Sequence, residues 1–196
     1  MNALHVIRNR VDEVSKILPE FVSKCSDDLV NAADLVVTAF KSDFKVLICG
    51  NGGSAADSQH LAAEFVNAFS REIQRPALSA IALTVDTSIL TAFSNDFGYE
   101  NVFARQVEAH GRKGDVLIVI TTSGSSRNCV SAVMAAKSRG LSTIALTRDG
   151  GEINTLVDIA IGVPSNNTQH IQECHMIGYH ILAELVETSL YGGVQK

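Results

Sequence analysis

Residues 46–64 carry a strand–turn–helix pattern that ties the chain to an α/β architecture. Residues 46–49 are a short apolar run, typical of a buried parallel strand. The glycine-rich residues 50–53 then predict a tight turn whose backbone can approach a ligand closely. Ser54 is expected to cap the following helix, with Asp57 three residues later as in a capping box.

The turn at residues 50–54 has the features of an anion site, because free N–H groups and the helix dipole at a helix N-terminus favour phosphate. The turn does not match G-x-G-x-x-G and lacks the lysine of a Walker A loop, so NAD and ATP are disfavoured. On the helix, His60 and Glu64 are four residues apart and share a face, where they could transfer protons or bind a metal ion. The alternative is an ordinary solvated surface pair.

A second element of the same kind follows the apolar residues 116–120. Residues 121–126 read Thr-Thr-Ser-Gly-Ser-Ser and lead into a helix predicted for residues 127–139. Hydroxyl and N–H groups at a helix start can surround a phosphate with neutral donors, although a hydroxyl-rich connector capped by Ser126 is also possible. Because ligands of open α/β sheets collect at the carboxyl ends of strands, two such loops together favour the phosphate site.

Strand and helix patterns alternate along the chain and predict a flavodoxin-like three-layer α/β sandwich, with a parallel five-stranded sheet covered on both faces. We expect residues 1–196 to form a single domain. The predicted strands are residues 46–49, 78–83, 116–120, 141–146 and 158–163. The predicted helices after the first strand are residues 54–70, 86–93, 102–110, 127–139 and 168–190, with residues 94–98 as a turn.

Two further helices are predicted before the first strand, at residues 2–24 and about 27–40. This N-terminal helical extension exceeds what one strand–helix–strand unit needs. Its apolar faces could cover the sheet or a partner subunit, and we favour an oligomer interface for residues 1–42.

Composition narrows the class of partner. The net charge of −5, without a cluster of basic residues, disfavours nucleic-acid binding. No apolar run reaches the roughly 18 residues of a membrane span, and the N-terminus shows no signal-peptide pattern. The four cysteines have no C-x-x-C spacing, which predicts reduced thiols in the cytoplasm.

Six segments together carry a family resemblance. They are NGGS at residues 51–54, HLAAE at 60–64, SNDFGYENVFARQVEA at 94–109, GDVLIVITTSG at 114–124, TTSGSS at 121–126 and HIQECHMIGYHILAELVE at 170–187. With these segments the chain resembles the phosphoheptose isomerases of the sugar isomerase (SIS) domain family, over nearly its whole length. One departure is Ala68, which stands where the family commonly has an arginine.

The resemblance implies an aldose–ketose isomerase that converts sedoheptulose 7-phosphate to D-glycero-D-manno-heptose 7-phosphate, the first step toward the heptoses of bacterial surface polysaccharides such as lipopolysaccharide. It also implies a homotetramer with one Zn²⁺ per subunit. The implied acid–base residues are Glu64 and His180, and the implied zinc ligands are His60, Glu64, Gln172 and His180. The implied substrate contacts are Asn51, Gly52, Gly53, Ser54, Glu64, Asn95, Asp96, Thr121, Thr122, Ser123, Ser126 and Gln172.

These residue types suit the implied chemistry. Moving a proton between carbons 1 and 2 through an enediol requires a base near the carbon and an acid near the carbonyl oxygen, and a metal ion can polarise the carbonyl. Gln172 and His180 are eight residues apart on one helix, about 12 Å along its axis. We therefore predict that one of them reaches the shared site from a neighbouring subunit, which would make oligomerisation necessary for activity.

Two other functions are compatible with the fold. Some SIS relatives are non-catalytic adaptors that bind the bacterial replication initiator, and others isomerise different sugar phosphates. Adaptors tend to lose the acidic residue of the H-x-x-x-E motif or the late histidine, and this chain retains both Glu64 and His180.

Overall fold

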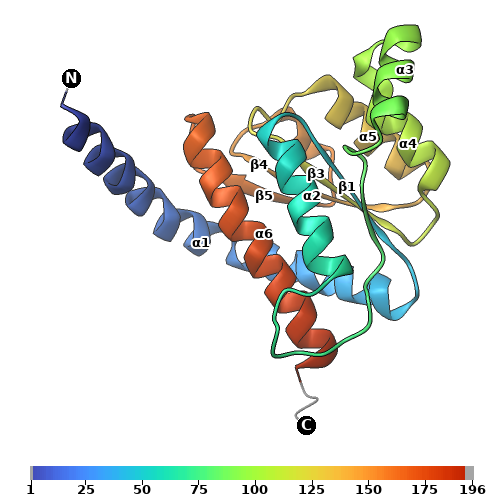
Figure 1. The fold of residues 1–196 in the computed structure, drawn as a ribbon, viewed down its shortest axis with the longest axis horizontal. Helices are drawn as coiled ribbons and strands as arrows, with labels where there is room; N and C mark the ends of the chain where they lie inside the picture. Colours follow the sequence, from blue (N-terminus) through green and yellow to red (C-terminus); the bar gives the residue numbers. More distant parts are fainter. Residues whose placement is uncertain (1, 193–196) are drawn as a thin grey trace.

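The computed structural model, which describes residues 2–192, contains a parallel five-stranded sheet in the order β2-β1-β3-β4-β5 (Figure 1). This is the flavodoxin-like order, so the predicted fold class is confirmed. The strands are β1 (Val46–Gly50), β2 (Ala80–Ala82), β3 (Val116–Ile120), β4 (Ser142–Arg148) and β5 (Ile159–Val163). The helices are α1 (Ala3–Lys41), α2 (Gly53–Val66), α3 (Thr87–Phe97), α4 (Val102–His110), α5 (Arg127–Ser138) and α6 (Thr168–Tyr191), with 3-10 turns at Tyr99–Asn101 and Glu152–Thr155.

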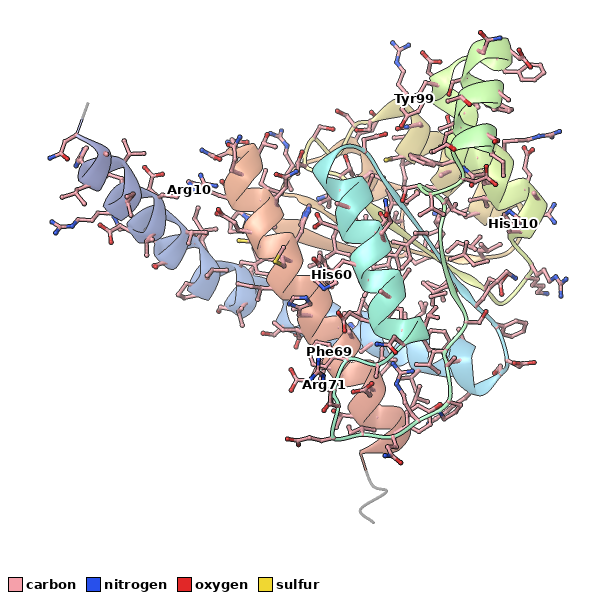
Figure 2. The ribbon with its side chains drawn as sticks, in the orientation of Figure 1. Arg10, His60, Phe69, Arg71, Tyr99 and His110 are labelled. Atoms are coloured by element: carbon pink, nitrogen blue, oxygen red, sulfur yellow. The ribbon has the colours of Figure 1, made fainter. Side chains whose placement is uncertain are left out.

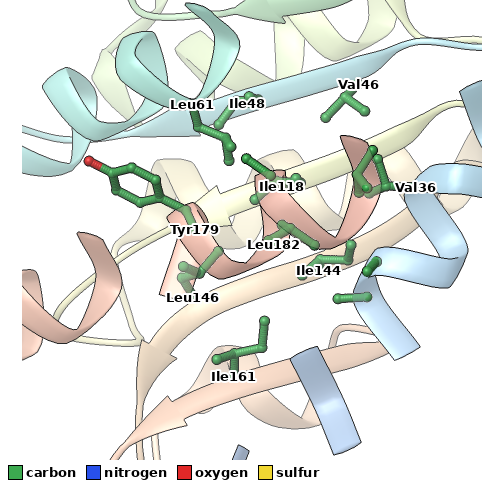
Figure 3. Close-up of a cluster of buried hydrophobic side chains, with 14 of the residues drawn as sticks. Val36, Val46, Ile48, Leu61, Ile118, Ile144, Leu146, Ile161, Tyr179 and Leu182 are labelled. Carbon is green, nitrogen blue, oxygen red and sulfur yellow. The ribbon is translucent and has the colours of Figure 1, made fainter. Parts of the chain in front are cut away.

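Two hydrophobic cores lie on opposite faces of the sheet, because successive side chains of a strand point to opposite sides. On one face, Ile48 and Ile118 pack with α1, α2 and α6 (Figure 3). On the other, Leu47 and Leu117 pack with α4 and α5. β1 and β3 are buried along their whole length, as expected for central strands covered on both sides.

The N-terminal extension is one helix, so the prediction of two separate helices was wrong. Its buried stripe continues in phase through the predicted break and includes Phe21, Cys25, Leu29, Ala32, Ala33 and Val36. Packing of this stripe on the sheet and α6 holds the second half of α1 helical. The first half projects from the body of the molecule and leaves Leu4, Ile7 and Val11 exposed (Figure 1). Within residues 2–192, no helix is both long and apolar enough to cross a bilayer.

Several predicted boundaries also need correction. α2 is capped by Gly52, whose φ of 58° favours glycine, while Ser54 lies inside the first turn and makes no capping bond. The capping box with Asp57 was therefore wrong. α2 ends at Val66 rather than about Ser70, and α3 extends through the predicted turn to Phe97 before Gly98 ends it. β2 is three residues long, shorter than predicted.

His175 on α6 provides a pH-dependent term in stability. It is fully buried and its Nε2 lies 3.0 Å from the Thr147 carbonyl oxygen, so the neutral ring donates there. Burial lowers the pKa of His175 to about 4. The unfolded chain, with an ordinary pKa of about 6.5, then binds more protons at mildly acidic pH, and stability falls as pH drops from about 6.5 to 4.

We expect wild type to lose about 3 kcal/mol of unfolding free energy through this group between pH 7 and 4, at about 1.4 kcal/mol per pKa unit. Urea unfolding at several pH values measures the loss. In His175→Gln, which keeps an N–H donor for Thr147, this part of the pH dependence should disappear. The exposed His110→Gln is the control. An identical pH slope in wild type and His175→Gln would contradict the assignment.

Candidate active site

The two predicted phosphate loops start side by side. β1 and β3 are neighbours, with Gly50 paired to Ile120 at their carboxyl ends. The sheet order reverses between these strands, with β2 beyond β1 and β4 beyond β3, which is where ligands of open α/β sheets bind. A Cβ at Gly50 would lie 2.6 Å from the Ser54 carbonyl oxygen and 2.8 Å from that of Ile120, so only glycine allows this approach.

Three hydroxyls converge in the loop after β3. The oxygens of Thr121, Ser123 and Ser126 lie 3.2–3.3 Å from one another at the start of α5. Ser126 is the N-cap residue but makes no capping bond, so its hydroxyl is available to a ligand. Neutral donors converging at a helix N-terminus fit the oxygens of a phosphate group. Thr122 lies in the same loop, and Ser54, which is buried, lies in the first turn of α2 directly after the other loop.

The side chain of Asn51 joins the two loops. Its amide exchanges two hydrogen bonds with Asn128 on α5, at 2.9 and 2.8 Å, and accepts a third from the Tyr99 hydroxyl at 3.1 Å. These bonds occupy the Asn51 side chain, so a substrate would meet its backbone more readily. Asn128 and Tyr99 were missed by sequence reasoning, because nothing local marks contacts that span 77 and 48 residues.

Three of the predicted zinc ligands meet between α2 and α6. Figure 2 labels one of them, His60. The ligand atoms of His60, Glu64 and His180 all lie within 4.8 Å of one another. His60 Nε2 is 3.0 Å from a Glu64 oxygen, and the His60 and His180 rings are 5.0 Å apart. Burial lowers the pKa of His180, His60 lowers it further, and Glu64 opposes them. Two imidazoles and a carboxylate are a donor set that suits Zn²⁺.

Gln172, the fourth predicted ligand, lies near the start of α6. A Cβ built on Gly53 would be 2.4 Å from its Nε2, so the Gln172 amide lies against the turn of the first loop. It is eight residues, about 12 Å along the helix, from His180. Within one chain the structure thus separates Gln172 from the His60–Glu64–His180 cluster.

Asn95 and Asp96 lie on the exposed surface of α3, where the Asn95 amide donates to the Asp96 carboxylate at 2.8 Å. They lie in the last turn of α3, shortly before Tyr99, which contacts Asn51. Asn95 and Asp96 therefore lie on α3, which connects to the first loop through Tyr99, and their side chains make no hydrogen bond to that loop among the described residues.

The segment after α2 is held by a buried ion pair. Arg75 and Glu187 have side chains only 1% and 3% exposed, and the Arg75 Nε lies 2.7 Å from a Glu187 oxygen. Arg75 also donates to the carbonyl oxygens of Glu64 and Phe65 at the end of α2. Glu187 accepts from the Phe69 and Ser70 N–H groups.

This ion pair fixes the position of Phe69, whose ring centre is 6.0 Å from that of His180. It thereby anchors both the end of α2, which carries Glu64, and the segment that lies against His180. Neither Arg75 nor Glu187 was assigned a role in the site from the sequence.

The chain matches the SIS domain family over residues 11–148. It is 48% identical to the phosphoheptose isomerase of Akkermansia muciniphila, covering 95% of this chain and 98% of that protein. The phosphoheptose isomerase of Neisseria gonorrhoeae has a similar structure, with a TM-score of 0.90 at 40% identity, covering 95% of this chain and all of that one. The enzyme from Francisella tularensis gives 0.91 at 37% identity, covering 96% and 100%. The chain belongs to the SIS domain family and, within it, to the phosphoheptose isomerases.

Proposed function

We propose that this chain interconverts sedoheptulose 7-phosphate and D-glycero-D-manno-heptose 7-phosphate, supplying heptose for bacterial surface polysaccharide. The observation that carries the proposal is the meeting of Glu64 and His180 in a chain that also holds two phosphate loops at the switch point of its sheet. The relatives named above support the substrate class. An adaptor has no need of a carboxylate and an imidazole placed together, so this geometry disfavours the non-catalytic alternative.

In the proposed mechanism, the hydroxyls of Thr121, Ser123 and Ser126 bind the phosphate and fix the position of the sugar chain. The Glu64 carboxylate takes a proton from carbon 1 of the ketose, and the His180 imidazolium gives a proton to the carbonyl oxygen at carbon 2. The resulting enediol is then reprotonated at carbon 2, while the hydroxyl on carbon 1 loses its proton. The product is the aldose.

Zn²⁺ fits the donor set of His60, Glu64 and His180, and when bound it would act as a Lewis acid that polarises the substrate carbonyl. Gln172 would complete the ligand set from a neighbouring subunit. Glu64 can act as the base, and His180 as the acid, only when neither side chain is held by the ion.

A complete site also needs two subunits. Glu64 is eleven residues after Gly53 on α2, about 16 Å along the axis, so one chain separates its phosphate loops from its acid–base pair. We propose that the loops of one subunit face the Glu64–His180 pair of another within a homotetramer. The exposed apolar residues Leu4, Ile7 and Val11 on α1 provide a surface for such an assembly. The four buried, free cysteines suit a reducing compartment such as the cytoplasm.

Mixing two inactive variants tests the shared site. Ser123→Ala with Ser126→Ala removes two of the three hydroxyls proposed to bind the phosphate, and Glu64→Gln removes the base. If each site combines two subunits, unfolding and refolding the variants together should restore activity, because some sites receive an intact half from each parent. Refolding each variant alone is the control. A mixture no more active than its parents would show that each chain forms its own site.

Turnover of purified protein on a panel of phosphorylated ketoses tests the function itself. We expect sedoheptulose 7-phosphate to have the highest kcat/KM. Faster turnover of a hexose or amino-sugar phosphate would support the other isomerase class, and no turnover of any of them would support the adaptor.

A further inference from the structure

Three polar side chains form a hydrogen-bonded network across the α2–α6 interface, behind the His60–Glu64–His180 cluster. The Tyr179 hydroxyl lies 3.0 Å from His60 Nδ1 and 3.5 Å from a carboxyl oxygen of Asp57. Asp57 precedes His60 by one turn of α2, and Tyr179 comes from α6. Tyr179 is completely buried and Asp57 is 8% exposed, so water competes little for these bonds.

The positions of the protons in this network follow from the groups on either side of the His60 ring. On the Nε2 side, the Glu64 carboxylate lies 3.0 Å away and can only accept, so Nε2 carries a proton. Nδ1 of the neutral ring then has a lone pair, and the Tyr179 hydroxyl donates to it. The 3.0 Å contact to Nδ1, shorter than the contact to Asp57, agrees with this direction.

Binding a metal ion through Nε2 requires the opposite arrangement. The ring proton must then be on Nδ1, which becomes a donor, and a hydrogen-bonding partner on that side fixes such a ligand. A tyrosine hydroxyl can accept this bond provided that its own hydrogen has another acceptor. The carboxyl oxygen Oδ1 of Asp57, 3.5 Å from the Tyr179 oxygen, is such an acceptor.

Asp57 has no other evident role. It caps no helix and pairs with no cation among the described residues. Its Oδ1 has only the long 3.5 Å contact to the Tyr179 hydroxyl, and its Oδ2 is buried without a hydrogen-bond partner in the described part of the chain. A buried carboxyl group left in this way calls for an explanation. Accepting the Tyr179 hydrogen when His60 changes its proton position provides one.

We propose that Asp57 and Tyr179 are positioning residues that let His60 exchange tautomers when a divalent metal ion enters the cluster. With no metal, Tyr179 donates to His60. With the metal bound, His60 donates to Tyr179 and Tyr179 donates to Asp57. This inference rests on the proposed metal site and adds the groups that make His60 a competent ligand.

The experiment combines ¹⁵N-histidine NMR with calorimetric titration of Zn²⁺ at a pH of about 8, above the ordinary pKa of histidine. In metal-free wild type we expect the His60 proton on Nε2, and after Zn²⁺ addition on Nδ1. Tyr179→Phe should bind Zn²⁺ about 10–100-fold more weakly, as for other losses of an outer hydrogen bond to a ligand. Asp57→Ala should weaken binding similarly but leave the metal-free tautomer unchanged.

Asp57→Asn, which restores an acceptor oxygen, should recover part of the affinity lost in Asp57→Ala. Tyr191→Phe near the end of α6 is the matched control and should bind as wild type. Should Tyr179→Phe fail to fold, the wild-type spectra still test the change of His60 tautomer, and the two Asp57 variants still test the loss of Zn²⁺ affinity.

Equal Zn²⁺ affinity in wild type, Tyr179→Phe and Asp57→Ala would overturn the inference while leaving the metal site intact. A His60 proton that stays on the same nitrogen after Zn²⁺ binds would do the same. If wild type itself binds no Zn²⁺ at His60, the proposed metal site fails, and this inference fails with it.

Discussion

Glu64→Gln and His180→Gln will each lower kcat for the isomerisation by about 10²–10⁴-fold, the usual contribution of a positioned acid or base. Glutamine matches the size of glutamate and has hydrogen-bonding groups, but its amide cannot take a proton from carbon. At position 180, glutamine can donate a hydrogen bond but cannot transfer a proton at neutral pH. Both side chains are only partly buried, so the variants should fold.

The matched control for these variants is Glu184→Gln, which changes the same chemical group on the exposed face of α6. It should keep wild-type kcat. Steady-state kinetics should show that kcat falls in the active-site variants, while thermal unfolding should show little change in Tm. A Glu64→Gln variant with more than a tenth of wild-type kcat would remove Glu64 from the role of base.

Arg75→Ala or Glu187→Ala will lower the free energy of unfolding by about 3–5 kcal/mol, because each leaves an unpaired charge in the interior. Both side chains are almost completely inaccessible to water. Loss of Arg75 also leaves the carbonyl oxygens of Glu64 and Phe65 without this donor. Loss of Glu187 leaves the two N–H groups after α2 that donate to it without an acceptor. The end of α2 should loosen as a result.

Urea unfolding of the two single variants and of the double variant measures this pair. The double variant should lose less than the sum of the singles, since removing both partners leaves no isolated charge. Arg105→Ala, which breaks an exposed ion pair with Glu108, is the control and should cost at most about 1 kcal/mol. A loss of less than 1 kcal/mol in Arg75→Ala would contradict the role of the ion pair.

The layered fold was predictable because it depends on local patterns. Short apolar runs such as residues 116–120, flanked by turns and helices, leave few arrangements other than a covered parallel sheet. The division of the N-terminal extension into two helices was not predicted correctly. Pro19 and the acidic residues Asp27 and Asp28 are local break signals, but the buried stripe of α1 packs on the sheet and outweighs them.

The candidate site was predictable only in part, for the same reason. The spacing of His60 and Glu64 on one helix, and the hydroxyl-rich loop at residues 121–126, could be read locally. Placing His180 beside them required the family resemblance, since it is more than a hundred residues away. Tyr179, which contacts His60 across 119 residues, has no local signal at all, because only the packing of α6 on α2 brings it there.

Isomerisation of sedoheptulose 7-phosphate in D₂O, followed by NMR, tests the proposed proton transfer most directly. A base that takes the proton from carbon 1 exchanges it with solvent, so the aldose product should carry deuterium at carbon 2, and Glu64→Gln should form almost none of it. An aldose whose hydrogen at carbon 2 comes entirely from the substrate, or equal deuterium incorporation by Glu64→Gln, would contradict this account.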